Sequence, residues 1–217
     1  LRRVCVAMVM MVCVVYVAQA HDFEVDGIYY NITSETNKTV EVTYKGESYS
    51  TIIEYSGDIV VPENVSYNDT LYSVVSIGAY AFYNCGDMTS IAIPNSVIHI
   101  GNSAFSGCSG LTNVTISNSV ICIGNYVFSN CTALTSIVIP NSVTNIGEQA
   151  FYNCTGLTRV EFNAENCETM GHLSSPVFKE CTALSSVVIG DKVKIVPDYA
   201  FCYCEGLECV KIGNSVV

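Results

Sequence analysis

Cysteine and histidine are the residues of this 217-residue sequence with the clearest potential for metal binding or catalysis, and it contains twelve and three of them. Six cysteines recur at near-constant intervals and lack the paired Cys-x-x-Cys spacing of zinc sites. The histidines, His21, His99 and His172, are scattered and support no catalytic triad. We therefore expect no metal, no cofactor and no enzymatic activity.

The recurrent cysteines are interpreted as small apolar side chains in a buried column. Cys122, Cys167, Cys202 and Cys209 lie outside this recurrence and are the better disulfide candidates in an exported chain. Neighbours within the column would also lie within disulfide distance of each other. A metal held by Cys202, Cys204 and Cys209 is the less favoured alternative.

The charge pattern excludes two broad classes of protein. Nine basic and twenty acidic residues give a net charge of −11, yet only 13% of residues are charged and 50% are hydrophobic. A disordered acidic chain or a nucleic-acid binder needs a higher density of charge. No basic residue occurs between Lys45 and Arg159, so no nucleic-acid partner is expected.

Residues 1–20 have the pattern of a signal peptide. Arg2 and Arg3 precede an apolar run over 4–17, and Ala18-Gln19-Ala20 provides small residues for cleavage before His21. The run is shorter than the roughly 20 residues that a membrane-spanning helix needs, and no second run follows. We expect export to the cell surface or medium, with no transmembrane segment after removal of the signal.

An internal repeat determines the architecture. The repeat is marked by phenylalanines 23, 23, 23, 27 and 23 residues apart, at Phe82, Phe105, Phe128, Phe151, Phe178 and Phe201. A cysteine follows each three residues later, at Cys85, Cys108, Cys131, Cys154, Cys181 and Cys204. Leucine or methionine follows three residues further on, and then come alternating β-branched residues. A fixed period in this range with one apolar template indicates a solenoid.

Each unit contains a strand, a turn, a second extended piece and a compact turn. The strand is predicted from alternation such as that in 111–116, and Pro94 or Pro140 ends it. Gly78, Gly101, Gly124 and Gly147 follow the second extended piece, where we expect a reversal with positive φ. The three-residue spacing of Phe, Cys and Leu predicts one α or 3₁₀ turn. Stacked coils should pair their strands in parallel.

The template Ile-Gly-x-x-Ala-Phe-x-x-Cys-x-x-Leu-Thr-Ser-Ile-x-Ile-Pro-Asn-Ser-Val, nearly complete in 123–143, resembles the BspA-like leucine-rich repeats of bacterial surfaces. The resemblance covers 75–217. The predicted fold class is an α/β repeat, a right-handed parallel leucine-rich-repeat solenoid of about six coils with short helical turns. Four extra residues between Phe162 and Phe178 predict a protruding loop.

The two ends of the mature chain differ from the repeat. Residues 21–74 are predicted to form a small β-rich N-terminal cap, with a hairpin signal where the alternation of 39–44 meets Lys45-Gly46-Glu47. At the other end, 213–217 begin a seventh coil without a polar cap, so we expect a truncated C-terminal end or missing repeats.

The exposed face of the strands is the candidate binding surface. It is expected to carry Ser90, Asn113, Thr115, Ser136, Arg159, Glu161, Ser186 and Lys211. Such a flat, nearly neutral face suits contact with a macromolecule better than binding of a metabolite. The resemblance implies adhesion to extracellular partners such as host matrix or cell-surface proteins. The alternative is a passive structural scaffold or a fragment of a larger surface protein.

Overall fold

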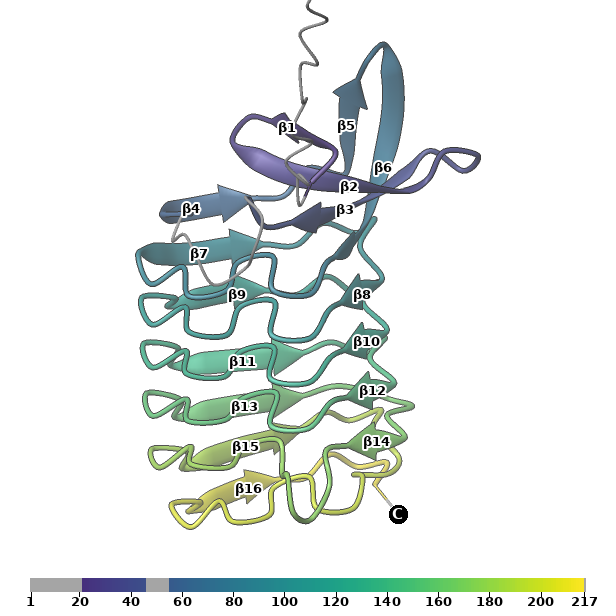
Figure 1. Cartoon of the computed structure of the whole chain (residues 1–217). Helices are drawn as coiled ribbons and strands as arrows, with labels where there is room; N and C mark the ends of the chain where they lie inside the picture. The colour runs from purple at the N-terminus through teal and green to yellow at the C-terminus, as the bar shows by residue number, and fades with distance from the viewer. Residues whose placement is uncertain (1–20, 46–54, 217) are drawn as a thin grey trace, which may run out of the picture.

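Two rows of β-strands run along the sides of a stack of coils (Figure 1). The computed structural model describes residues 21–45 and 55–216, so the predicted signal peptide at 1–20 lies outside the described residues. In chain order the strands are β1 (Phe23–Val25), β2 (Ile28–Ser34), β3 (Thr39–Thr43), β4 (Gly57–Val60), β5 (Asn64–Tyr67), β6 (Thr70–Ile77), β7 (Met88–Ala92), β8 (His99–Ile100), β9 (Asn113–Thr115), β10 (Cys122–Ile123), β11 (Ser136–Ile139), β12 (Asn145–Ile146), β13 (Arg159–Phe162), β14 (Thr169–Met170), β15 (Ser186–Ile189) and β16 (Cys209–Lys211).

The first row contains the longer strand of each coil, from β4 at one end of the stack to β16 at the other (Figure 1). β7 pairs in parallel with β4 and β9, while β11, β13, β15 and β16 form a second parallel set. Equivalent residues face each other, as Ser136 faces Arg159 and Arg159 faces Ser186. The parallel stacking predicted from the repeat is confirmed.

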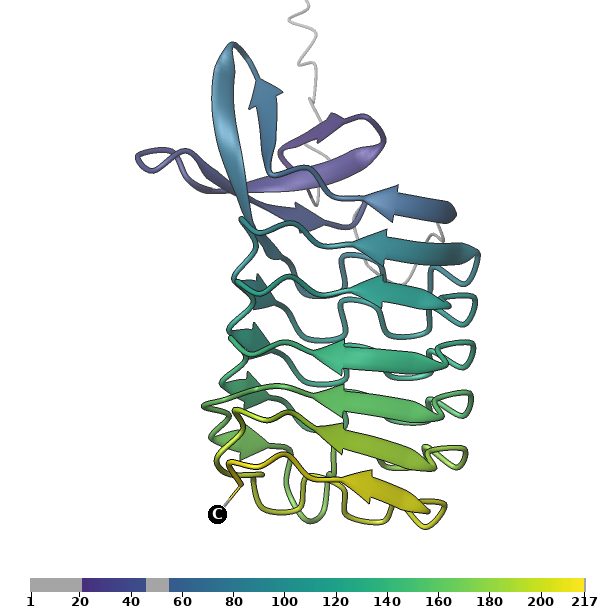
Figure 2. The same cartoon turned by 180° about the vertical axis from the view of Figure 1, so that it is seen from behind.

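The second row, seen from behind in Figure 2, contains the short strands β8, β10, β12 and β14. They pair in parallel with each other, and β8 pairs in the same way with β6. β6 also pairs in parallel with β3, and the sheet then continues through antiparallel pairs to β2 and β1. The N-terminal strands therefore extend the same hydrogen-bonded sheet.

A column of stacked phenylalanines fills the centre of the coils. Ring centroids of consecutive members lie between 5.1 and 5.4 Å apart, from Phe82 at one end to Phe201 at the other. All members are fully buried except Phe201, which is partly exposed. Tyr55 packs against the first ring, with 4.6 Å between its centroid and that of Phe82. Each ring therefore packs against the equivalent ring of the next coil.

The compact turns are not helical, and the prediction of short helical turns is wrong. Residues 21–45 and 55–216 contain no helix. The N–H groups of Tyr126, Phe128 and Asn130 donate to carbonyls of the next coil at 3.0, 2.7 and 2.8 Å. A helix would need those donors for its own carbonyls. Tyr126 and Asn130 also have φ of 57° and 61°, which interrupt any right-handed helix.

The conserved spacing of glycines has a different cause from the one predicted. Gly78, Gly101, Gly124 and Gly147 do not adopt positive φ. They lie instead where the backbones of neighbouring coils come close, since a Cβ on Gly101 would lie 2.6 Å from the Ala79 nitrogen. Real Cβ atoms essentially never approach within 3.0 Å. These glycines are therefore required by packing between coils.

The insertion of four residues is accommodated in two places. One extra residue precedes β14, because Thr169 pairs with Asn145, 24 residues earlier, instead of 23. The remaining residues fall in 171–176, where His172 and Ser175 form an isolated bridge. The side chains of His172, Leu173 and Ser174 are exposed, in agreement with the predicted loop.

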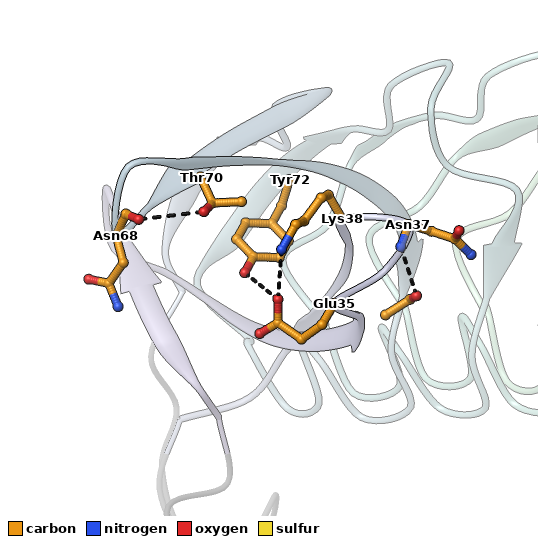
Figure 3. A network of polar contacts seen from close by, with 7 residues as sticks. Glu35, Asn37, Lys38, Asn68, Thr70 and Tyr72 are labelled. Carbon is orange, nitrogen blue, oxygen red and sulfur yellow. Dashed lines mark hydrogen bonds and ion pairs between the residues drawn. The ribbon is translucent and has the colours of Figure 1, made fainter.

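A polar network joins two hairpins at the N-terminal end (Figure 3). Glu35 Oε2 accepts hydrogen bonds from the Tyr72 hydroxyl at 2.9 Å and from Lys38 Nζ at 3.1 Å. These bonds, that from Lys38 first, hold the pKa of the Glu35 carboxyl below its usual value. The network links the β2–β3 turn to β6. The turn predicted at Lys45-Gly46-Glu47 extends into residues outside the described ranges.

Candidate binding face

All eight predicted face residues lie on the outward side of the first row of strands. We call this surface, formed by β7, β9, β11, β13, β15 and β16, the sheet face. Alternation places every second residue of a strand outward, so the sequence pattern specifies which side chains the face presents. The exposed members are Asn113, Thr115, Ser136, Arg159 and Lys211, and the partly buried ones are Ser90, Glu161 and Ser186.

Charge on the sheet face is confined to its C-terminal half. Arg159 Nη2 lies 3.7 Å from Glu161 Oε2 on the same strand. Glu161 Oε1 also accepts a hydrogen bond from Asn163 Nδ2 at 3.0 Å. Two strands further along, Lys211 is exposed on β16. Because the Arg159 charge is neutralised locally, Lys211 contributes most of the positive potential of this surface.

Sequence reasoning missed the residues that extend this face at the N-terminal end. β4 pairs with β7, which places Asp58 beside Ser90 and Val60 beside Ala92. Asp58 Oδ1 accepts hydrogen bonds from the hydroxyls of Ser90 and Thr89, both at 2.7 Å. These bonds, that from Ser90 first, lower the pKa of the Asp58 carboxyl.

A partial copy of the repeat template could have revealed β4. Residues 59–65 read Ile-Val-Val-Pro-Glu-Asn-Val, and 91–97 read Ile-Ala-Ile-Pro-Asn-Ser-Val. The two segments share the apolar alternation, the proline and the final valine. The phenylalanine and cysteine of the template are absent before Ile59, so alignment on those two columns passes over this coil.

The recurrent cysteines are buried hydrogen-bond donors as well as small core residues. The thiols of Cys108, Cys131, Cys154 and Cys181 donate to the carbonyl of a phenylalanine in the preceding coil, at 3.0–3.2 Å. The sequence predicted their burial but not these bonds. Burial is the main cause of the raised pKa of the Cys108 and Cys131 thiols. Protonated thiols of this kind are poor nucleophiles and poor metal ligands.

The residues considered for metal binding or catalysis lie apart from each other. Over residues 21–45 and 55–216, no three His, Cys, Asp or Glu side chains form a group suited to a metal ion. All ten cysteines in these ranges are free thiols, so none of the disulfides considered from the sequence is formed. His21 is buried in the N-terminal segment, whereas His99 and His172 are exposed in different coils.

Two grooves lie outside the sheet face. One, of about 680 Å³, is lined by the inserted loop and the turns of the last two coils, including Leu173, Lys179 and Tyr203. The second, of about 500 Å³, lies between β4 and the β1–β2 turn at the opposite end of the stack. Sequence reasoning predicted neither, because each depends on segments that depart from the repeat.

These features define a class of protein: a parallel β-solenoid whose repeated coils present one continuous strand face. Six copies of the BspA type leucine rich repeat region match residues 75–208. The chain belongs to this family of leucine-rich repeat proteins, as the resemblance predicted. No curated protein matches the chain.

Solved structures of bacterial leucine-rich repeat proteins share the fold. A protein from Bacteroides ovatus is 35% identical with a TM-score of 0.60, and the match covers 90% of this chain and 54% of that one. The Treponema pallidum protein TpLRR is 26% identical with a TM-score of 0.69, covering 88% and 81%. A protein from Bacteroides capillosus is 28% identical with a TM-score of 0.52, covering 64% and 96%. The chain thus spans about half the length of the Bacteroides ovatus protein.

Membrane association through a helix was also assessed over the described residues. In 21–45 and 55–216, no helix has the length and apolar character needed to cross a membrane.

Proposed function

We propose that this chain is an exported protein that binds other proteins outside the cell through the sheet face. The observation that carries the proposal is the row of outward side chains on six consecutive strands, none of which the core uses. Solenoids of this kind offer extended surfaces for macromolecular binding. The signal-peptide pattern of residues 1–20 supports an extracellular location.

The chemistry of the face favours an acidic region of a host matrix or cell-surface protein as the partner. Lys211 is exposed, and Arg159 has half of its side-chain surface accessible despite its contact with Glu161. The strands between β7 and β11 contribute small uncharged groups such as Asn113 and Thr115. Affinity would therefore come from broad contact, with the C-terminal half setting charge preference.

Solid-phase capture of fibronectin and fibrinogen tests this proposal. The double variant Arg159→Glu, Lys211→Glu should weaken capture of an acidic partner about fivefold and reverse the salt dependence. Thr115→Ala is the matched control on the same face and should change capture little. All variants should keep the melting temperature of the parent, because the substituted side chains are exposed.

A passive scaffold is the second candidate. It is favoured by the absence of charge from the exposed side chains of β9 and β11 in the middle of the sheet face. If neither matrix protein nor intact cells are retained above a charge-matched control protein, the scaffold becomes the better explanation.

A further inference from the structure

The outer edge of β4 has backbone hydrogen-bonding groups without a strand partner. In the part of the chain that the structure describes, β4 is the terminal strand of its sheet and pairs only with β7. Gly57 N donates to Asp87 O at 2.9 Å and Val61 N donates to Ala92 O at 3.2 Å, both toward β7. Because donors alternate along an extended strand, the N–H and C=O groups of Asp58 and Val60 point the other way.

This free edge forms one wall of the 500 Å³ groove. The β1–β2 turn forms the opposite wall and lies beside β4 at the top of the stack (Figure 1). The buried rings of Tyr30 and Tyr55 also line the groove. The space therefore lies where a further strand would be added to the sheet.

The side chains around the edge alternate in character. Ile59 points toward the core and packs against it, whereas Val60 is 71% exposed. Asp58 faces outward beside Ser90 and has its Oδ1 atom oriented by two hydroxyl groups. Asp26 lines the groove from the β1–β2 turn, and no lysine or arginine is among the described residues of the lining.

We propose that this groove binds an extended polypeptide segment with alternating basic and apolar side chains, which adds to the free edge of β4 as a further strand. Its backbone would bond to Asp58 and Val60, as in other cases of strand addition. Side chains on the inner side would meet Ile59 and the tyrosine rings, so they should be apolar. Side chains on the outer side would lie near Asp58, so they should be basic.

The length of the segment follows from strand geometry. β4 has four residues, which at about 3.3 Å per residue span about 13 Å. A partner of about four to six extended residues would therefore cover the edge. This site lies at the opposite end of the row of strands from Lys211, so it is independent of the function proposed for the sheet face.

Fluorescence anisotropy with the full mature chain tests the proposal. The probe is a labelled eight-residue peptide of alternating lysine and valine, and glutamate replaces lysine in its control. The lysine peptide should bind saturably, at least about tenfold more tightly than the glutamate peptide. Binding should weaken as salt is raised.

Two substitutions at position 60 separate backbone pairing from side-chain contact. Val60→Pro removes an outward N–H group while leaving the bonds to β7, and should weaken binding about five- to tenfold. Val60→Ala keeps the N–H group and should change binding less than about threefold. Asp26→Asn tests the charge without altering the edge and should weaken binding of the lysine peptide a few-fold.

Equal binding of the lysine and glutamate peptides would overturn the charge preference. Equal binding by Val60→Pro and Val60→Ala, with matched melting curves, would overturn pairing with β4. If Val60→Pro does not fold, the Asp26→Asn result and the two peptides decide the outcome. Arg159→Glu, Lys211→Glu should leave peptide binding unchanged, which distinguishes this site from the sheet face.

Discussion

Substitution of Phe128 by alanine tests the energetic role of the aromatic column. Phe128 is fully buried, and its ring centroid lies 5.2 Å from that of Phe105 and 5.1 Å from that of Phe151. Phe→Ala changes at buried sites cost about 3–5 kcal/mol, and neighbouring rings fixed in stacked coils leave little room to fill the cavity. We expect Phe128→Ala to fall in that range.

Phe201 provides a matched comparison within the same column. It is partly exposed and has one stacked neighbour, Phe178, at 5.4 Å. One aromatic pair contributes about 0.5–1.5 kcal/mol beyond burial, so Phe201→Ala should cost about 1–2 kcal/mol. It should also affect the last coil alone, because each coil contacts only its neighbours.

Urea unfolding monitored by circular dichroism gives both free energies. The two variants and the parent should be compared by linear extrapolation, with attention to any second transition. A loss below about 1 kcal/mol for Phe128→Ala would refute the reasoning. Equal losses for the two variants would show that burial between two rings adds nothing.

Two further predictions concern ionisable groups. At pH 8, iodoacetamide should modify exposed Cys209 in the folded protein but reach Cys108 and Cys131 only in urea, because burial raises the pKa of both thiols. Peptide mass spectrometry measures this, and modification of Cys131 without denaturant would contradict its assignment. Hydrogen bonds from Lys38 and Tyr72 lower the pKa of Glu35, so its contribution to stability is present at neutral pH and is lost as pH falls through that lowered value. The difference in unfolding free energy between the parent and Glu35→Gln should therefore shrink between about pH 6 and about pH 3, and a constant difference would exclude this role.

The periodic part of the fold could be predicted from the sequence because each column repeats a chemical requirement. The buried phenylalanines, the parallel strands and the outward position of Arg159 all follow from spacing alone. Spacing does not specify hydrogen-bond partners. The three-residue interval from Phe128 to Cys131 suits a helical turn, but the N–H of Phe128 donates to Ala150 of the next coil at 2.7 Å.

The N-terminal end of the candidate surface was harder to predict. Asp58 lies on a strand whose coil keeps the isoleucine and proline of the template but lacks its phenylalanine and cysteine. Tyr55 occupies the end of the aromatic column instead, against Phe82. A residue that substitutes for a template member at a different spacing leaves no signal in a search based on a fixed period.

The coil-to-coil register has a consequence for how the length of such proteins changes. Ile123 and Ile146 end the equivalent strands β10 and β12, and both are buried at the same place in their coils. Deletion of 124–146 would join Ile123 to Gly147 and bring Phe105 against Phe151 with every column still aligned. Loss or duplication of one 23-residue unit therefore preserves all contact types, so recombination between repeats can vary the reach of the molecule without creating a new fold.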